Sequence, residues 1–152
     1  MLEAGYGLRV MSTEPHECPL HGAAVDHDRL VGRRVVQIVA ARHRYDSEEA
    51  VGPLEIWLVD DLGEYIHITT GSDWCLIVDD AAPHAGYDLG DSGRVEVVTS
   101  GHGTPFARYV GEAISSVDER FDARTGRVGL EICFSTGSVQ CRSWRGDLHL
   151  AG

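Results

Sequence analysis

Short runs of alternating apolar and polar residues fill the chain from Leu30 onward, and this period of two limits the fold more than any other feature. Glycine, aspartate, serine and proline separate the runs, as is typical of turns between strands. The pattern predicts strands at residues 33–42, 54–59, 64–70, 74–78, 94–99, 112–119, 128–134, 138–144 and 147–151. We therefore expect a mainly β protein with little helix.

Two hairpins are predicted within this pattern. The first turns through residues 60–63 and places Leu58 opposite Tyr65 and Trp57 opposite Ile66. Both of its faces are largely apolar, which is typical of a strand pair inside a packed sheet.

The second hairpin is predicted to turn through residues 135–138. Its register pairs Ile132 with Cys141, and it pairs Glu131 with Arg142 on the other face as opposite charges. It also sends Cys133 and Cys141 to opposite faces, which argues against a disulfide between them.

The chain also repeats its order of features. Two copies, at about residues 30–78 and 109–150, each read as a strand, a hairpin and a short return strand, and residues 79–108 link them. Two such units predict a single antiparallel barrel or sandwich with pseudo-twofold symmetry. Matching segments are Leu30-Val31-Gly32 with Tyr109-Val110-Gly111, Leu54-Glu55-Ile56 with Leu130-Glu131-Ile132, Gly63 with Gly137, and Asp73-Trp74-Cys75-Leu76 with Asp147-Leu148-His149-Leu150.

One domain is predicted over residues 30–152, preceded by a mobile segment at residues 1–29 that lacks any sustained period. The longest uncharged apolar stretch, residues 35–41, is far shorter than the ~20 residues of a membrane-spanning helix. Four cysteines match no disulfide framework, so we expect free thiols and a cytoplasmic protein without membrane contact.

Composition excludes several kinds of chemistry. All 13 basic residues are arginine, and the chain has neither lysine nor asparagine. A Schiff-base lysine, a P-loop lysine and a Ser-Lys dyad are therefore impossible, and so are an N-glycosylation site and a Cys-His-Asn protease site.

The net charge of −11 is concentrated in one part of the chain. Residues 45–93 contain twelve acidic residues and no arginine. Such a segment disfavours nucleic acid as a partner, because binding it requires cations that neutralise phosphates. The segment is either a solvated face that keeps the protein soluble or, as the functional alternative, a surface that docks a basic protein. The candidate contacts of such a surface are Asp60, Asp61, Glu64, Asp79, Asp80, Trp57 and Trp74.

Two further kinds of site are weighed against this interpretation. A ligand pocket or an active site at the pseudo-twofold interface would draw on His67, Asp73, Asp147 and His149. His67 is otherwise expected opposite Ile56, as a core histidine. The group His16, Cys18, His21 and His27 offers zinc-type ligands, but its spacing matches no zinc module, so we predict no metal and no cofactor.

A family resemblance rests on five segments: Leu30-Val31-Gly32, Leu54-Glu55-Ile56-Trp57-Leu58, Asp73-Trp74-Cys75-Leu76, Tyr109-Val110-Gly111 and Gly146-Asp147-Leu148-His149-Leu150. In these the chain resembles a family of small uncharacterised bacterial β-rich proteins. It is also similar in style to the immunity proteins of polymorphic toxin systems. The resemblance implies a small, acidic, cytoplasmic binding protein and brings no catalytic residues.

The sequence thus favours a non-enzymatic binding protein of immunity type that docks a basic partner. The alternative is a small-ligand-binding protein or enzyme with its pocket between the two repeats. A third reading is an oligomerisation domain whose strand edges pair between copies; the sequence does not set the oligomeric state.

Overall fold

A computed structural model describes residues 26–45, 48–49, 52–71, 74–99 and 103–152. Two antiparallel sheets face each other as a sandwich and do not close into a barrel, so the predicted mainly β class is confirmed. The helical elements are α1 (His27–Leu30) and two 3₁₀ turns, η1 (Gly90–Ser92) and η2 (Pro105–Tyr109). The segment predicted to be mobile lies outside the described residues, except at its end where α1 begins.

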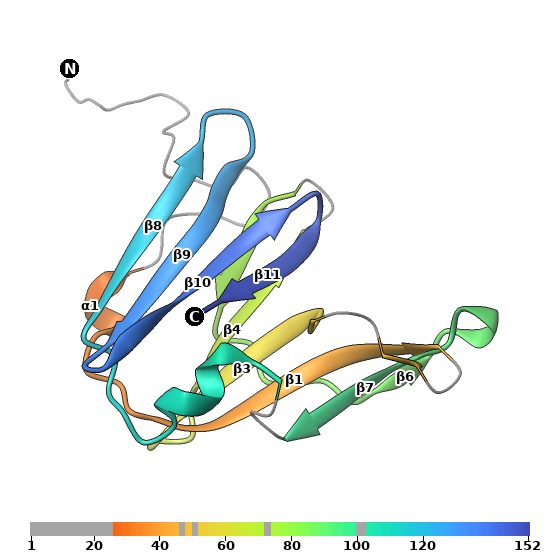
Figure 1. The fold of residues 1–152 in the computed structure, drawn as a ribbon, viewed down its shortest axis with the longest axis horizontal. Helices are drawn as coiled ribbons and strands as arrows, with labels where there is room; N and C mark the ends of the chain where they lie inside the picture. Colours follow the sequence, from red (N-terminus) through yellow and green to blue (C-terminus); the bar gives the residue numbers. More distant parts are fainter. Residues whose placement is uncertain (1–25, 46–47, 50–51, 72–73, 100–102) are drawn as a thin grey trace.

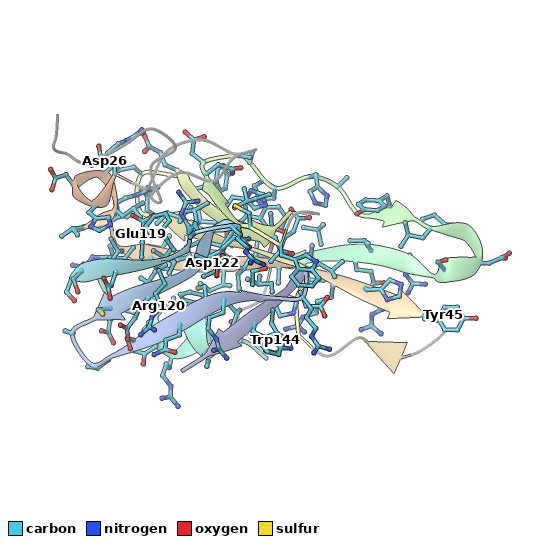
Figure 2. All side chains as sticks on the ribbon, turned by 90° about the horizontal axis from the view of Figure 1, so that it is seen from above. Asp26, Tyr45, Glu119, Arg120, Asp122 and Trp144 are labelled. Atoms are coloured by element: carbon cyan, nitrogen blue, oxygen red, sulfur yellow. The ribbon has the colours of Figure 1, made fainter. Side chains whose placement is uncertain are left out.

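The larger sheet has seven strands in the order β5-β4-β3-β1-β7-β6, with β2 paired to β1, and the smaller has four in the order β11-β10-β9-β8 (Figure 1). The larger comprises β1 (Val35–Tyr45), β2 (Glu48–Glu49), β3 (Glu55–Asp60), β4 (Tyr65–Thr70), β5 (Leu76–Asp79), β6 (Tyr87–Asp88) and β7 (Arg94–Thr99). The smaller comprises β8 (Ser116–Asp122), β9 (Gly126–Phe134), β10 (Gly137–Trp144) and β11 (Asp147–Ala151). Figure 2 shows Tyr45 near the tip of the part of the larger sheet that extends beyond the smaller one.

Alternation along the strands fills the space between the sheets with apolar side chains. Ile56 and Leu58 of β3 pair with Ile68 and Ile66 of β4, and all four are buried. They belong to one core cluster with the inward residues of the smaller sheet, among them Ile132. This row of residues occupies the interface between the two predicted repeats.

The register of the first predicted hairpin is wrong by one residue. Leu58 pairs with Ile66 and Trp57 with His67, so His67 does not face Ile56. The reason is Gly63, whose φ of 80° closes the turn and lets the amide of Asp60 donate to the carbonyl of Glu64. A left-handed residue after a tight turn adds one position to the loop.

The second hairpin turns through two residues rather than four. Ile132 therefore pairs with Val139, and Glu131 pairs with Gln140 instead of Arg142. This shift is even, so every side chain keeps its predicted face. Cys141 is buried, Cys133 is half-buried, and both are free thiols.

The two predicted repeats fold with one strand order. β1, β3, β4 and β5 form an antiparallel meander, and so do β8, β9, β10 and β11. Antiparallel meanders are common among unrelated sheets. Their likeness supports the predicted duplication, which stays an interpretation.

Residues 80–86, which we call the strap, cross the outer face of the larger sheet. They must do so because β5 and β6 lie at opposite edges of that sheet. Five strand spacings are about 24 Å, and the eight residue steps from Asp79 to Tyr87 reach about 27 Å when extended. The strap is therefore nearly straight, and it passes so close to β7 that a Cβ on Gly86 would lie 2.6 Å from the carbonyl oxygen of Val95.

Candidate functional site

The acidic residues predicted to contact a partner divide into exposed and buried groups. Asp61, Glu64, Asp79 and Asp80 are exposed, and they lie at the end of the larger sheet where β4 begins and β5 ends. Asp60 is only 3% exposed, so its predicted place on a docking surface is wrong.

Asp60 stabilises the β3–β4 turn instead. Its Oδ1 accepts the amides of Leu62 and Glu64, both at 2.9 Å, and its Oδ2 accepts Nε of Arg33 at 2.8 Å. Burial alone would raise the pKa of Asp60, but the hydrogen bonds from Glu64, Arg33 and Leu62 outweigh it and lower that pKa. The carboxylate is a turn cap and an ion-pair partner.

A groove of about 310 Å³ opens beside this turn, between α1 and the edge of the larger sheet. Three exposed carboxylates, Asp26, Asp79 and Asp80, line it. Apolar contact comes from Leu30, Tyr65, Ile66 and Val78, and two arginines, Arg29 and Arg33, complete the wall. The Nε of Arg33 is held by Asp60, so the groove stays negative overall.

A histidine–carboxylate cluster borders the groove on the outer face of the larger sheet. His67 lies opposite Trp57 on one side and Asp79 on the other, and its ring stacks on Trp57 at 4.9 Å between centroids. Its Nδ1 lies 2.7 Å from Asp79 Oδ1, and its Nε2 lies 2.7 Å from Glu55 Oε1. His84 of the strap reaches Glu55 Oε2 with Nε2 at 2.6 Å.

The contacts of the cluster determine where its protons lie. When His67 is protonated, both of its ring nitrogens can donate, one to Glu55 and one to Asp79, because an ionised carboxylate only accepts hydrogen bonds. The same holds for His84, whose Nδ1 lies 2.8 Å from the carbonyl oxygen of Ala85. Two imidazolium rings thus neutralise two carboxylates.

Titration of these groups follows from the contacts. Burial alone would lower the pKa of His67, but hydrogen bonds to Glu55 and Asp79 outweigh it and raise that pKa. The pKa of His84 is raised by its hydrogen bond to the Ala85 carbonyl and then by Glu55. Burial would raise the pKa of Glu55, and the bonds from the two histidines lower it instead.

This arrangement anchors the strap and pairs His67 with two carboxylates. Both ring nitrogens are engaged, and the ring is only 10% exposed. Trp57 is fully buried beneath His67 and His84, so its predicted place in a partner contact is wrong. The cluster adjoins the groove at Asp79, which belongs to both.

The residues predicted to share a pocket between the repeats do not converge. His67 lies on the outer face of the larger sheet, while Asp147 and His149 are exposed on edge strand β11. Asp73 lies outside the described residues. The space between the repeats is filled by the apolar core, so no common cavity joins the three described residues.

The metal candidates are outside the described residues, apart from His27. His27 lies 3.0 Å from Glu119 through Nε2, and no metal-binding group of histidine, cysteine or carboxylate side chains occurs in the part of the chain that the structure describes. Cys75 is disulfide-bonded, so the expectation of four free thiols is wrong. Disulfides are typical of oxidising compartments, and the cytoplasmic location stays a prediction.

Trp74 is the one predicted contact at the far end of β4. Trp74 lies after the end of β4, whereas Asp61 and Glu64 lie before its start, and it is 54% exposed. Neither Glu55 nor His84 was singled out from the sequence. The period of two places Glu55 on the same face as Trp57. His84 is brought to Glu55 only by the course of the strap, which the sequence pattern does not predict.

Comparison with protein-family models, curated proteins and solved structures finds no match. None of the helices among the described residues is long and apolar enough to cross a bilayer.

Proposed function

We propose that this chain is a non-enzymatic binding protein of immunity type that docks a basic protein at the acidic groove. The observation that carries the proposal is the groove itself, which three carboxylates and four apolar side chains line together with Arg29 and Arg33. A groove of this kind suits an arginine or lysine side chain, because Asp26 and Asp80 can attract the charged head, while Asp79 is paired with His67, and the apolar lining can pack the aliphatic stem.

The surroundings of the groove strengthen the electrostatic part of this argument. Asp61 and Glu64 are exposed on the adjoining turn and add negative charge at the same end of the sandwich. Clustered charge of one sign speeds the encounter with a partner of opposite sign and makes binding sensitive to salt.

Rigidity supports the proposal too. The groove wall at Asp79 is held by His67, and the wall at Arg33 is held by the buried Asp60. A preformed site loses less conformational entropy when a partner binds. His67 and Asp60 therefore affect binding by positioning the groove walls, and the exposed acidic residues affect it through their charge.

The test compares charge-reversal variants in pull-downs from the source cells, at low salt and with stepwise salt elution. Glu64→Arg/Asp80→Arg changes the groove and its adjoining turn, and Asp91→Arg/Asp147→Arg is the control with the same change in net charge at exposed sites away from both. We expect a basic protein that the wild type and the control retain. Titration of that protein, once purified, should show affinity weaker by at least about tenfold for the groove variant.

Two results would overturn the proposal. One is an eluate without a basic protein in stoichiometric amount. The other is equal affinity of the groove variant and the control, because the bound protein would then recognise another surface or only the net charge.

A further inference from the structure

A second cleft lies at the end of the sandwich opposite the acidic groove, at the far end of β4. Two tryptophans flank it, Trp74 from the β4–β5 loop and Trp144 from the end of β10, and each is 54% exposed. β4 separates the two ends by about 20 Å at the usual rise per residue. Asp122 and Trp144, on two walls of this cleft, are labelled in Figure 2.

Backbone geometry holds both indoles in place. Arg145 and Gly146 have φ of 53° and 85°, as a two-residue type I′ turn requires, and this turn follows Trp144 directly. Thr70 of the larger sheet donates through Oγ1 to the Gly146 carbonyl at 2.5 Å. A Cβ on Gly146 would stand 3.5 Å from Cδ1 of Trp74, so that indole lies against the turn.

Trp74 itself has a φ of 69°, which is unusual for a residue with a large side chain. Such conformations cost on the order of 1–3 kcal/mol and occur often at ligand-binding sites. About half of the Trp74 side chain is exposed to solvent, so the burial of apolar surface at this residue offsets little of the conformational strain.

The cleft has a volume of about 260 Å³, and both apolar and polar side chains line it. It is lined by Trp74, Asp122, Thr125, Val128, Ser143, Trp144 and Arg145. This volume is somewhat smaller than the roughly 300–1,000 Å³ of pockets for drug-sized ligands. The space therefore suits a single ring.

The rim combines groups that favour a neutral, hydroxylated ligand. Asp122 and Arg145 carry opposite charges beside one small cleft, so neither an anion nor a cation gains from it overall. The Arg145 guanidinium already lies 5.5 Å from the Trp144 ring centre, where it would oppose a second cation. The hydroxyl oxygen of Ser143 is buried and has no hydrogen-bond partner among the described residues, which is costly unless a ligand or water supplies one.

We propose that this cleft binds one neutral pyranose ring of a glycan. A pyranose has an apolar face of C–H groups that can lie on an indole, and a rim of hydroxyls that can both donate to Asp122 and accept from Arg145. The Ser143 hydroxyl would then gain its missing partner. This site is independent of the basic partner proposed for the acidic groove.

The experiment is binding of the intact protein to an array of neutral and sialylated glycans. A glycan retained on the array is then titrated in solution, with tryptophan fluorescence as the readout. We expect binding to neutral glycans, lost by at least about tenfold in Trp144→Ala and partly kept in Trp144→Phe. The control is Tyr45→Ala, which removes an aromatic ring of similar exposure, 53%, from the tip of β1 and should leave binding unchanged.

Ser143→Ala is a second variant that should still fold, because it removes one hydroxyl and leaves both indoles. It should weaken binding several-fold without lowering the midpoint of thermal unfolding, because the hydroxyl that it removes is unsatisfied in the unliganded protein. Retention of sialylated glycans alone, no retention of any glycan, or equal affinity of wild type and Trp144→Ala would each overturn the proposal.

Discussion

Removal of the Arg127 side chain should destabilise the sandwich more than most single substitutions. Arg127 is 1% exposed, and its Nε lies 2.9 Å from Glu119 Oε2 within the smaller sheet. Its Nη1 donates to the carbonyl of Leu76 at 3.1 Å, on β5 of the larger sheet. One buried guanidinium thus joins the two layers.

The magnitude follows from what Arg127→Met leaves behind. The Glu119 side chain is 6% exposed, so its carboxylate would stay buried after losing the guanidinium that lies 2.9 Å from it. Breaking a buried ion pair in this way costs about 3–5 kcal/mol. For a chain of this length, the same loss would lower the midpoint of thermal unfolding by roughly 6–20 °C.

The assay is urea unfolding followed by tryptophan fluorescence and far-ultraviolet circular dichroism. The double variant Arg127→Met/Glu119→Leu should recover most of the lost stability, since it replaces both members of the buried ion pair with apolar side chains. Arg120→Met, on an exposed neighbour of Glu119, should change stability by less than about 0.5 kcal/mol. A cost below about 1 kcal/mol for Arg127→Met, or no recovery in the double variant, would refute this reasoning.

Two further predictions concern the acidic end. Since the pKa of His67 is raised above its ordinary 6.5, its contribution to stability is complete below pH 6.5 and is lost as pH rises through the raised value. Urea unfolding across this range should show a fall in wild-type stability that His67→Gln flattens; identical slopes would contradict it. Asp60→Ala should cost about 2 kcal/mol or more, because Arg33 and the turn amides lose their acceptor, whereas Asp61→Ala should cost almost nothing in the same assay. Equal costs would show that the turn does not depend on Asp60.

The strands of this protein follow from local pattern. Each predicted strand overlaps an observed one, and β7 and β11 have the predicted bounds, because the period of two is a property of neighbouring residues. Registers were less predictable. Gly63 and the two-residue turn before Gly137 each changed a pairing, since turn type depends on one or two dihedral angles.

The sequence by itself determined the mainly β class, the acidic segment and the chemistry that is absent. Only the tertiary structure decided which acids face solvent: it buried Asp60 against Arg33 and left Asp80 in the groove. It also brought His84 onto Glu55 through the strap, and Trp74 and Trp144 into one cleft. These groupings depend on the packing of two sheets and on a crossing between opposite edges, which join residues far apart in the chain.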